Sequence, residues 1–159
     1  AKEKQLARTQ MQELENYYVK YLEGEKRIKA VTVCFTDLEG RFHMLDYDKK
    51  FLLKSHDNLT FDGSSIRGWR SIDNSDMLQV PDARTAFIDP FCDHPTLSLI
   101  CNIVDPITRE PYDRDPRQIA TKAANYLKLT GIADTAYMGP EAEFFIFDDV
   151  RFSTGPNEG

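Results

Sequence analysis

The sequence predicts an α+β fold, in which helices flank a group of short strands instead of alternating with them regularly. Three observations predict it: a helical periodicity near the start, β-rich runs punctuated by prolines through the middle, and a second helix start followed by a strand-like run near the end. This order indicates a small α+β domain over residues 1–112, and then the first helix and first strand of a further domain over residues 113–159.

The first predicted element is a helix over residues 2–23. Apolar residues such as Leu14, Tyr18 and Leu22 recur there at roughly helical spacing among Lys, Glu and Gln. Gly24 follows as a plausible stop, because glycine is common just past a helix end.

A β-hairpin is predicted next. In the run AVTVCFT, Val31, Val33 and Phe35 alternate with Thr and Cys, and the run RFHMLDY alternates again after the turn-like DLEG. Residues 46–50, DYDKK, are expected to form a solvated turn. The runs MLQVPD, TAFIDPF and TLSLICNIVD give three further strand signals, with prolines at their ends.

A second helix is predicted to begin at Asp115, an N-cap acid followed by proline at the first helical position, and to end at Gly131. The run over residues 133–152 that follows is expected to be one long strand. The buried stripe of the helix is expected to comprise Ile119, Ala123 and Tyr126 or Leu127.

Composition excludes some classes of function. The net charge of −6 and the pI near 5.1 disfavour a nucleic-acid partner, since phosphate backbones attract Lys and Arg. No apolar run is long enough to span a bilayer, and the start does not resemble a signal peptide. Cys34, Cys92 and Cys101 show no CxxC spacing and are expected to be buried thiols in a reducing compartment, so a cytoplasmic protein is predicted.

Two acids at the start of the last predicted strand form a candidate metal site. Glu141 and Glu143 would share one face of that strand, about 7 Å apart. Two acids so placed either lie in solvent or, where they are partly desolvated, share a proton or are neutralised by cations. Their oxygen donors suit Mg²⁺ or Mn²⁺ and not a soft metal. An E-x-E pattern alone leaves both interpretations open.

A non-periodic stretch over residues 57–76 contains the run FDGSSIRGW. It is longer than an ordinary connection, and such loops are functional or disordered. One interpretation is a turn with locally packed aromatics and an Asp-Gly capping acid. The other is a functional loop.

Taken together, FDGSSIRGW, NSDM, IDPF, YDRDPR, GIADT and GPEAEFFIFDDVRF resemble the N-terminal part of bacterial type I glutamine synthetases, from about residue 28 to the end. The resemblance implies a β-grasp domain followed by the start of the catalytic domain. It implies ATP-dependent ligation of ammonia to glutamate through γ-glutamyl phosphate, with ATP as substrate and two Mg²⁺ or Mn²⁺ ions. It also implies stacked rings, as in a dodecamer, with active sites between subunits.

The resemblance also implies roles for single residues. Glu141 resembles the ligand of the metal that serves the ATP phosphates, and Glu143 a ligand of the metal beside glutamate. Asp62 resembles a catalytic acid, donated by the neighbouring subunit, that holds ammonium and helps to remove its proton. Ser65 lies beside it in the same loop and is grouped with it.

Trp69 and Asp76 resemble the family loop that lines the subunit boundary near the active site, and Trp69 is placed in the cofactor-binding group. The resemblance implies that the aromatic residues of this loop, Phe61 and Trp69, pack on a neighbouring subunit and not on their own domain. The departure from the family is length, because the remaining metal ligands lie downstream in its members. The 159-residue chain alone is therefore expected to be inactive in ATP-dependent glutamine formation. Two alternatives stay open: a γ-glutamyl ligase for a larger amine, and a non-catalytic β-grasp binding module.

Overall fold

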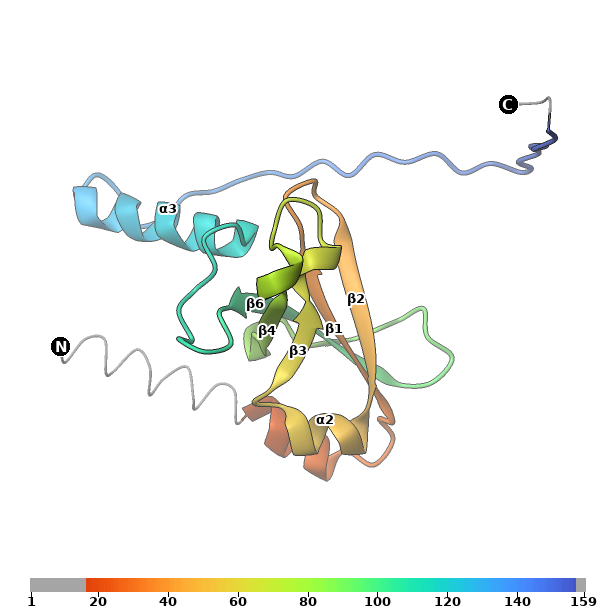
Figure 1. Ribbon diagram of the computed structural model, residues 1–159, viewed down its shortest axis with the longest axis horizontal. Coiled ribbons are helices and arrows are strands. Elements are labelled where there is room, and N and C mark those ends of the chain that lie inside the picture. Colours follow the sequence, from red (N-terminus) through yellow and green to blue (C-terminus); the bar gives the residue numbers. More distant parts are fainter. Residues whose placement is uncertain (1–16, 157–159) are drawn as a thin grey trace.

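The computed structural model describes residues 17–156, and within them one mixed sheet organises the fold. Its strand order is β2-β1-β6-β4-β3, and β5 pairs with β6 beside this path. The strands are β1 (Ala30–Thr36), β2 (Phe42–Asp48), β3 (Leu59–Asp62), β4 (Asp76–Pro81), β5 (Phe87–Ile88) and β6 (Thr96–Val104). Figure 1 shows the sheet at the centre of the fold.

The predicted hairpin is confirmed. β1 and β2 pair antiparallel over their full lengths, and Val31, Val33 and Phe35 are all buried on the inner face. β6 is the central strand, because its first half runs parallel to β1 and its second half pairs antiparallel with β4. The three later strand signals correspond to β4, β5 and β6.

The main core lies between the sheet and two short helices, as Figure 1 shows at the lower edge of the sheet. Residues 17–24 are helical, and their buried Tyr18 and Leu22 join Leu52 of α2 (Lys49–Ser55) in one cluster with the sheet. The rest of the helix predicted for residues 2–23 lies outside the described residues.

The prediction of a turn over residues 46–50 is wrong. Residues 46–48 are the last residues of β2, and Lys49 and Lys50 are the first residues of α2. Asp48 starts this helix, because its carboxylate accepts hydrogen bonds from the backbone N–H groups of Lys50 and Phe51. Seven residues span only two turns, which is too short for an apolar periodicity to show.

Helix α3 (Pro116–Thr130) has the predicted bounds. Asp115 accepts a hydrogen bond from the N–H of Arg117 at the start, and Gly131 closes the helix in the left-handed conformation with φ of 69°. The predicted buried stripe is wrong, however. No side chain of α3, which the structure describes in full, is buried, and Ile119 and Tyr126 are 51% and 69% exposed. Nothing among the described residues covers its apolar face.

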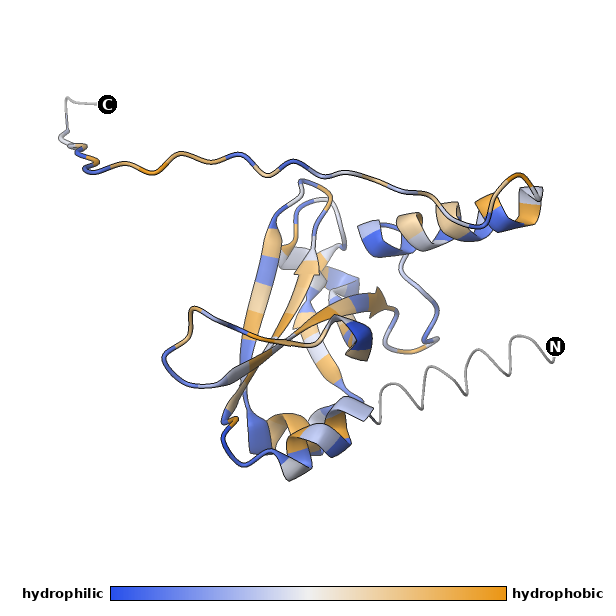
Figure 2. Ribbon diagram, turned by 180° about the vertical axis from the view of Figure 1, so that it is seen from behind, coloured by the Kyte–Doolittle hydropathy of each residue, from blue (hydrophilic) through white to orange (hydrophobic). Residues whose placement is uncertain are grey.

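The strand predicted over residues 133–152 does not form in this chain. The segment is extended, but no strand within residues 17–156 pairs with it, and Phe145 and Phe147 are 85% and 68% exposed. Figures 1 and 2 show it running away from the sheet, with an apolar stretch in its course. A strand needs a neighbour for its backbone hydrogen bonds, so apolar pattern alone does not make one.

Two of the three cysteines are buried. Cys34 and Cys101 are buried as predicted, whereas the prediction for Cys92 is wrong, because it is exposed in the connection between β5 and β6. Among the helices that the structure describes, none is long and apolar enough to cross a membrane.

Candidate active-site loop

The candidate catalytic acid lies where β3 ends in a tight turn. Asp62 is the last residue of β3, and one turn of 3-10 helix, η1 (Gly63–Ser65), follows directly. One carboxylate oxygen of Asp62 accepts hydrogen bonds from the backbone N–H of Ser64 at 2.9 Å and from its hydroxyl at 2.6 Å. The other oxygen accepts from the Ser65 hydroxyl at 2.6 Å. The structure thus brings together the two predicted residues, Asp62 and Ser65.

These hydrogen bonds favour the charged form of the acid. They hold the pKa of Asp62 below its usual range, the Ser64 hydroxyl contributing most and the Ser65 hydroxyl next. Asp62 is also exposed, and Asp76 lies directly opposite it in the β3–β4 pair. Two cross-strand acids at the solvent edge give this end of the sheet a local negative charge that attracts cations.

Gly63 fixes the turn against β4 by close contact. Its backbone N–H donates to the carbonyl of Ser75 at 2.7 Å. A Cβ atom at this position would lie 2.5 Å from Cγ of Met77 and 2.8 Å from the Ser75 carbonyl oxygen. Only glycine allows this approach without displacing the neighbouring strand, so Gly63 determines where the Asp62 carboxylate is held.

The aromatic residues of the loop pack within the chain. Trp69 is only 3% exposed and belongs to a second core cluster with Phe35 and Tyr112, against which Phe61 packs. Ring centroids lie 4.7 Å apart for Phe35 and Phe61 and 5.4 Å apart for Trp69 and Tyr112. The expectation that Phe61 and Trp69 pack on a neighbouring subunit and not on their own domain is therefore wrong. Phe61 and Trp69 bury their apolar surface against Phe35 of β1, inside their own domain.

The connection between β6 and α3 holds the loop from the other side. The Tyr112 hydroxyl donates to the backbone carbonyl of Trp69 at 2.5 Å, and the Arg114 guanidinium donates to the carbonyl of Gly68. Arg70 pairs with Asp105 at 3.1 Å. The loop that carries Asp62 is thus fixed by contacts both to the sheet and to the residues that lead into α3.

Glu141 and Glu143 lie elsewhere, on the exposed extended segment. Their carboxylates are the donors that Mg²⁺ or Mn²⁺ prefers, so their chemistry fits the predicted metals. Within residues 17–156, however, no group of three or more His, Cys, Asp or Glu residues is arranged to hold an ion. Two ligands from this chain can only contribute to a metal site that further ligands complete.

Sequence reasoning missed three residues of this site: Ser64, Gly63 and Tyr112. The Asp-Gly-Ser-Ser composition does contain a signal for the first two, because Asp and Ser side chains commonly hydrogen-bond to backbone N–H groups two or three residues along the chain. Tyr112 gives no local signal, since its partner carbonyl lies 43 residues away in sequence.

Family comparisons agree with this architecture. A family model described as the glutamine synthetase β-grasp domain matches residues 27–106, and one described as the glutamine synthetase catalytic domain matches residues 113–159. The chain therefore combines a β-grasp domain with the start of a ligase catalytic domain. It belongs to the glutamine synthetase family.

Individual relatives cover most of this chain. It is 47% identical over 136 residues to a glutamine synthetase of Haemophilus influenzae, which covers 84% of this chain and 29% of the relative. It is 51% identical over 140 residues to one of Frankia alni, covering 87% and 29%. The solved glutamine synthetase of Plasmodium falciparum superposes with a TM-score of 0.68 at 27% identity, over 76% of this chain and 23% of that one. The chain thus spans under a third of the length of these relatives.

Proposed function

We propose that this chain supplies the N-terminal part of an enzyme that ligates ammonia to L-glutamate, with ATP as the phosphoryl donor and γ-glutamyl phosphate as the intermediate. The observation that carries the proposal is the Asp62 turn: an exposed, ionised carboxylate held by Ser64 and Ser65 at a position that Gly63 and the buried aromatic cluster fix. Family membership supports the reaction type.

Asp62 is proposed to hold the ammonium ion before it reacts. Both carboxylate oxygens already accept hydrogen bonds from serine groups, which stabilises the anion and makes it a weak base. In this geometry Asp62 is better suited to attract and orient the ammonium ion than to retain a proton taken from it. The neighbouring charge of Asp76 strengthens that attraction.

Glu141 and Glu143 are proposed as ligands of two divalent ions, one serving the ATP phosphates and one beside glutamate. Such ions, when bound, neutralise charge during phosphoryl transfer. This chain contributes a carboxylate to each, and residues outside it complete the sites. Trp69 remains a prediction as a cofactor-binding residue. Its burial in the chain's own core gives it a structural role as well.

A ring of subunits, stacked in two layers, is proposed as the setting for this chemistry, with Asp62 reaching the neighbouring subunit's catalytic domain. Two features support it. The extended segment exposes a run of aromatic residues that needs a cover, and β2 and β3 are free edges of the sheet. A cytoplasmic location and a domain boundary near residue 112 also stay proposals.

The test is steady-state kinetics of the full-length protein with Asp62→Asn. The substitution keeps the shape of the side chain and removes its charge, so the KM for ammonium should rise about 10- to 100-fold while the KM for glutamate changes little. Asp93→Asn, which removes an exposed acid from the connection between β5 and β6, is the matched control. Unchanged ammonium dependence in Asp62→Asn would contradict the proposal.

The same assay separates the alternatives. Phosphate release that depends on a polyamine and not on ammonium would identify a ligase for a larger amine. A non-catalytic module would show no amine-dependent phosphate release at all, and Asp62→Asn would leave its behaviour unchanged.

A further inference from the structure

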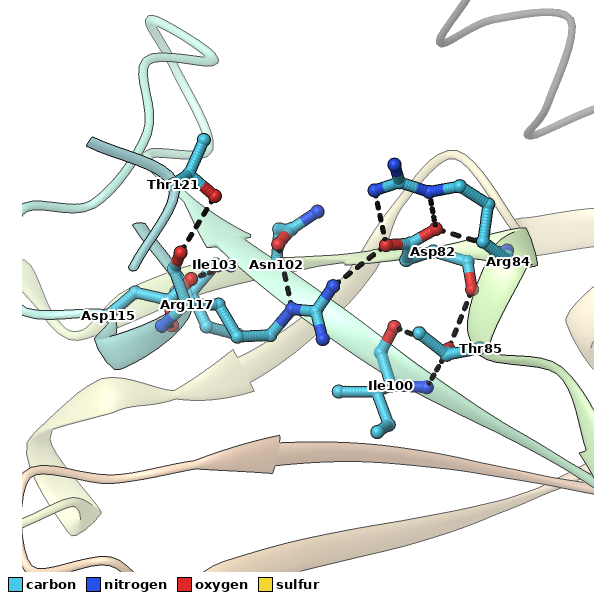
Figure 3. A network of polar contacts seen from close by, with 9 residues as sticks. All are labelled: Asp82, Arg84, Thr85, Ile100, Asn102, Ile103, Asp115, Arg117 and Thr121. Carbon is cyan, nitrogen blue, oxygen red and sulfur yellow. Dashed lines mark hydrogen bonds and ion pairs between the residues drawn. The ribbon is translucent and has the colours of Figure 1, made fainter. Parts of the chain in front are cut away.

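A polar network at the start of α3 joins the two parts of the chain, and it lies outside the Asp62 loop. Figure 3 shows it: the Arg117 guanidinium, from the first turn of α3, lies between Asp82, just after β4, and Asn102 of β6. Arg117 pairs with Asp82 at 2.7 Å and donates through Nε to Asn102 Oδ1 at 3.0 Å.

Asp82 is held in place at the point where Arg117 contacts it. Its side chain is only 6% exposed, and its backbone N–H donates to the carbonyl of Ile100 at 2.8 Å, which fixes it to β6. Arg84 pairs with the same carboxylate at 2.8 Å from the outside, where its own side chain is 70% exposed. Asp82 thus has two cationic partners, of which only Arg117 belongs to α3.

A second buried acid anchors the same helix end. Asp115 is 1% exposed, and its two carboxylate oxygens accept from different elements: one from the N–H of Arg117 in α3 at 3.0 Å, the other from the N–H of Ile103 in β6 at 2.9 Å. One side chain therefore caps the helix and ties it to the sheet.

These polar contacts, and not an apolar interface, join the start of α3 to the sheet. No side chain along α3 is buried, so hydrophobic packing does not fix the helix to the sheet in this chain. The guanidinium of Arg117 donates in two directions, to Asp82 and to Asn102, and such directional contacts define an angle more sharply than apolar contact does. The direction in which the chain leaves the β-grasp domain is therefore set by Arg117, Asp82, Asn102 and Asp115.

We propose that Arg117, held between Asp82 and Asn102, is a positioning residue that sets the orientation of the catalytic domain relative to the β-grasp domain, and thereby the placement of Asp62 in the shared active site. This rests on the proposed function of Asp62. In the proposed ring, Asp62 of one subunit reaches the metal ligands of its neighbour. A change in the orientation of the β-grasp domain on its own catalytic domain therefore moves Asp62 relative to that neighbouring site.

The experiment compares two substitutions that each remove one guanidinium from Asp82 in the full-length protein. Arg117→Ala breaks the link to α3, whereas Arg84→Ala leaves it in place and serves as the matched control. Arg117→Ala should raise the KM for ammonium between about 3-fold and 100-fold, because small misplacements of a binding group weaken it strongly. The KM for glutamate should stay nearly constant, and Arg84→Ala should behave as the unsubstituted protein.

Arg117→Lys adds a graded test. Lysine keeps a positive charge opposite Asp82 but lacks the planar fork that also reaches Asn102, so its ammonium KM should fall between those of the unsubstituted protein and Arg117→Ala. If Arg117→Ala does not fold, Arg117→Lys takes its place under the same criterion. An unchanged ammonium KM, an equal effect of Arg84→Ala, or an equal rise in the KM for every substrate would each overturn the proposal.

Asp62→Asn, measured in parallel, separates the two hypotheses. A raised ammonium KM in Asp62→Asn but not in Arg117→Ala would refute only the positioning role. An unchanged KM in Asp62→Asn would refute the proposed role of Asp62 itself.

Discussion

Replacing Gly63 with alanine tests whether close packing of the turn holds the active-site loop. The added Cβ would meet Cγ of Met77 at 2.5 Å and the backbone carbonyl of Ser75 at 2.8 Å. The side-chain atom can move, but the carbonyl belongs to the segment that leads into β4. Relief of the clash therefore has to separate Gly63 from Ser75 and break the 2.7 Å hydrogen bond between them.

The magnitude follows from these two effects. Overpacking of a close contact costs about 1–3 kcal/mol. Loss of the backbone hydrogen bond adds about 0.5–1.5 kcal/mol. Together they predict that opening of the loop becomes easier by about 1.5–4.5 kcal/mol, which corresponds to an increase of about 12- to 1,600-fold in the open population.

Hydrogen exchange of the full-length protein, followed by mass spectrometry, measures this opening directly. Peptides that cover residues 60–78 should exchange faster in Gly63→Ala by that factor. Gly24→Ala is the matched control, because no atom lies within 4 Å of its added Cβ, and it should leave exchange in those peptides unchanged. Equal exchange in the two variants would refute the argument that Gly63 fixes the turn.

Three further predictions concern stability, each measured as the thermal unfolding midpoint of the full-length protein. Gln79→Met should raise the midpoint by removing a buried amide whose two polar atoms have no partner among the described residues, a gain of about 1–3 kcal/mol; a lower midpoint would contradict this. Tyr112→Phe should lower it by about 1–3 kcal/mol, since the Trp69 carbonyl loses its donor, and an unchanged midpoint would show that this bond is dispensable. Hydrogen bonding and charge from Arg84 lower the pKa of Asp82, so its stabilisation is complete above the ordinary pKa of 3.8 and is lost as the pH falls through the lower folded-state pKa. Asp82→Asn should therefore flatten the loss of stability on acidification below about pH 4, and an unchanged pH profile would count against the ionised pair.

Local signals in the sequence predicted the elements that depend on local physics. The β-branched and aromatic residues Val31, Val33 and Phe35 were enough to predict β1, although both faces of that strand are buried. The cap at Asp115 and the left-handed Gly131 were enough for the bounds of α3. Each of these features is decided by a few neighbouring residues, so it can be inferred without knowing the fold.

Features that depend on distant partners could not be predicted in this way. An apolar pattern in α3 or in residues 133–152 indicates that a face needs a cover, but not what covers it. The same limit explains the error at Trp69. An aromatic residue in a non-periodic loop gives no sign of whether it packs within its own domain or on another subunit. At Asp62 the family resemblance predicted a site residue, whereas the hydrogen bonds from Ser64 and Ser65 appeared only in three dimensions.

Subunit mixing tests most directly the claim that Asp62 of one subunit serves the metal ligands of another. Asp62→Asn and Glu141→Gln subunits of the full-length protein are co-assembled in equal amounts and assayed at a low ammonium concentration, at which the raised KM leaves Asp62→Asn alone nearly inactive. If the site is shared, about a quarter of the interfaces in a random ring join an intact Asp62 to an intact Glu141, and the account predicts that this fraction of activity returns. Mixed assemblies that stay as inactive as either parent would contradict it.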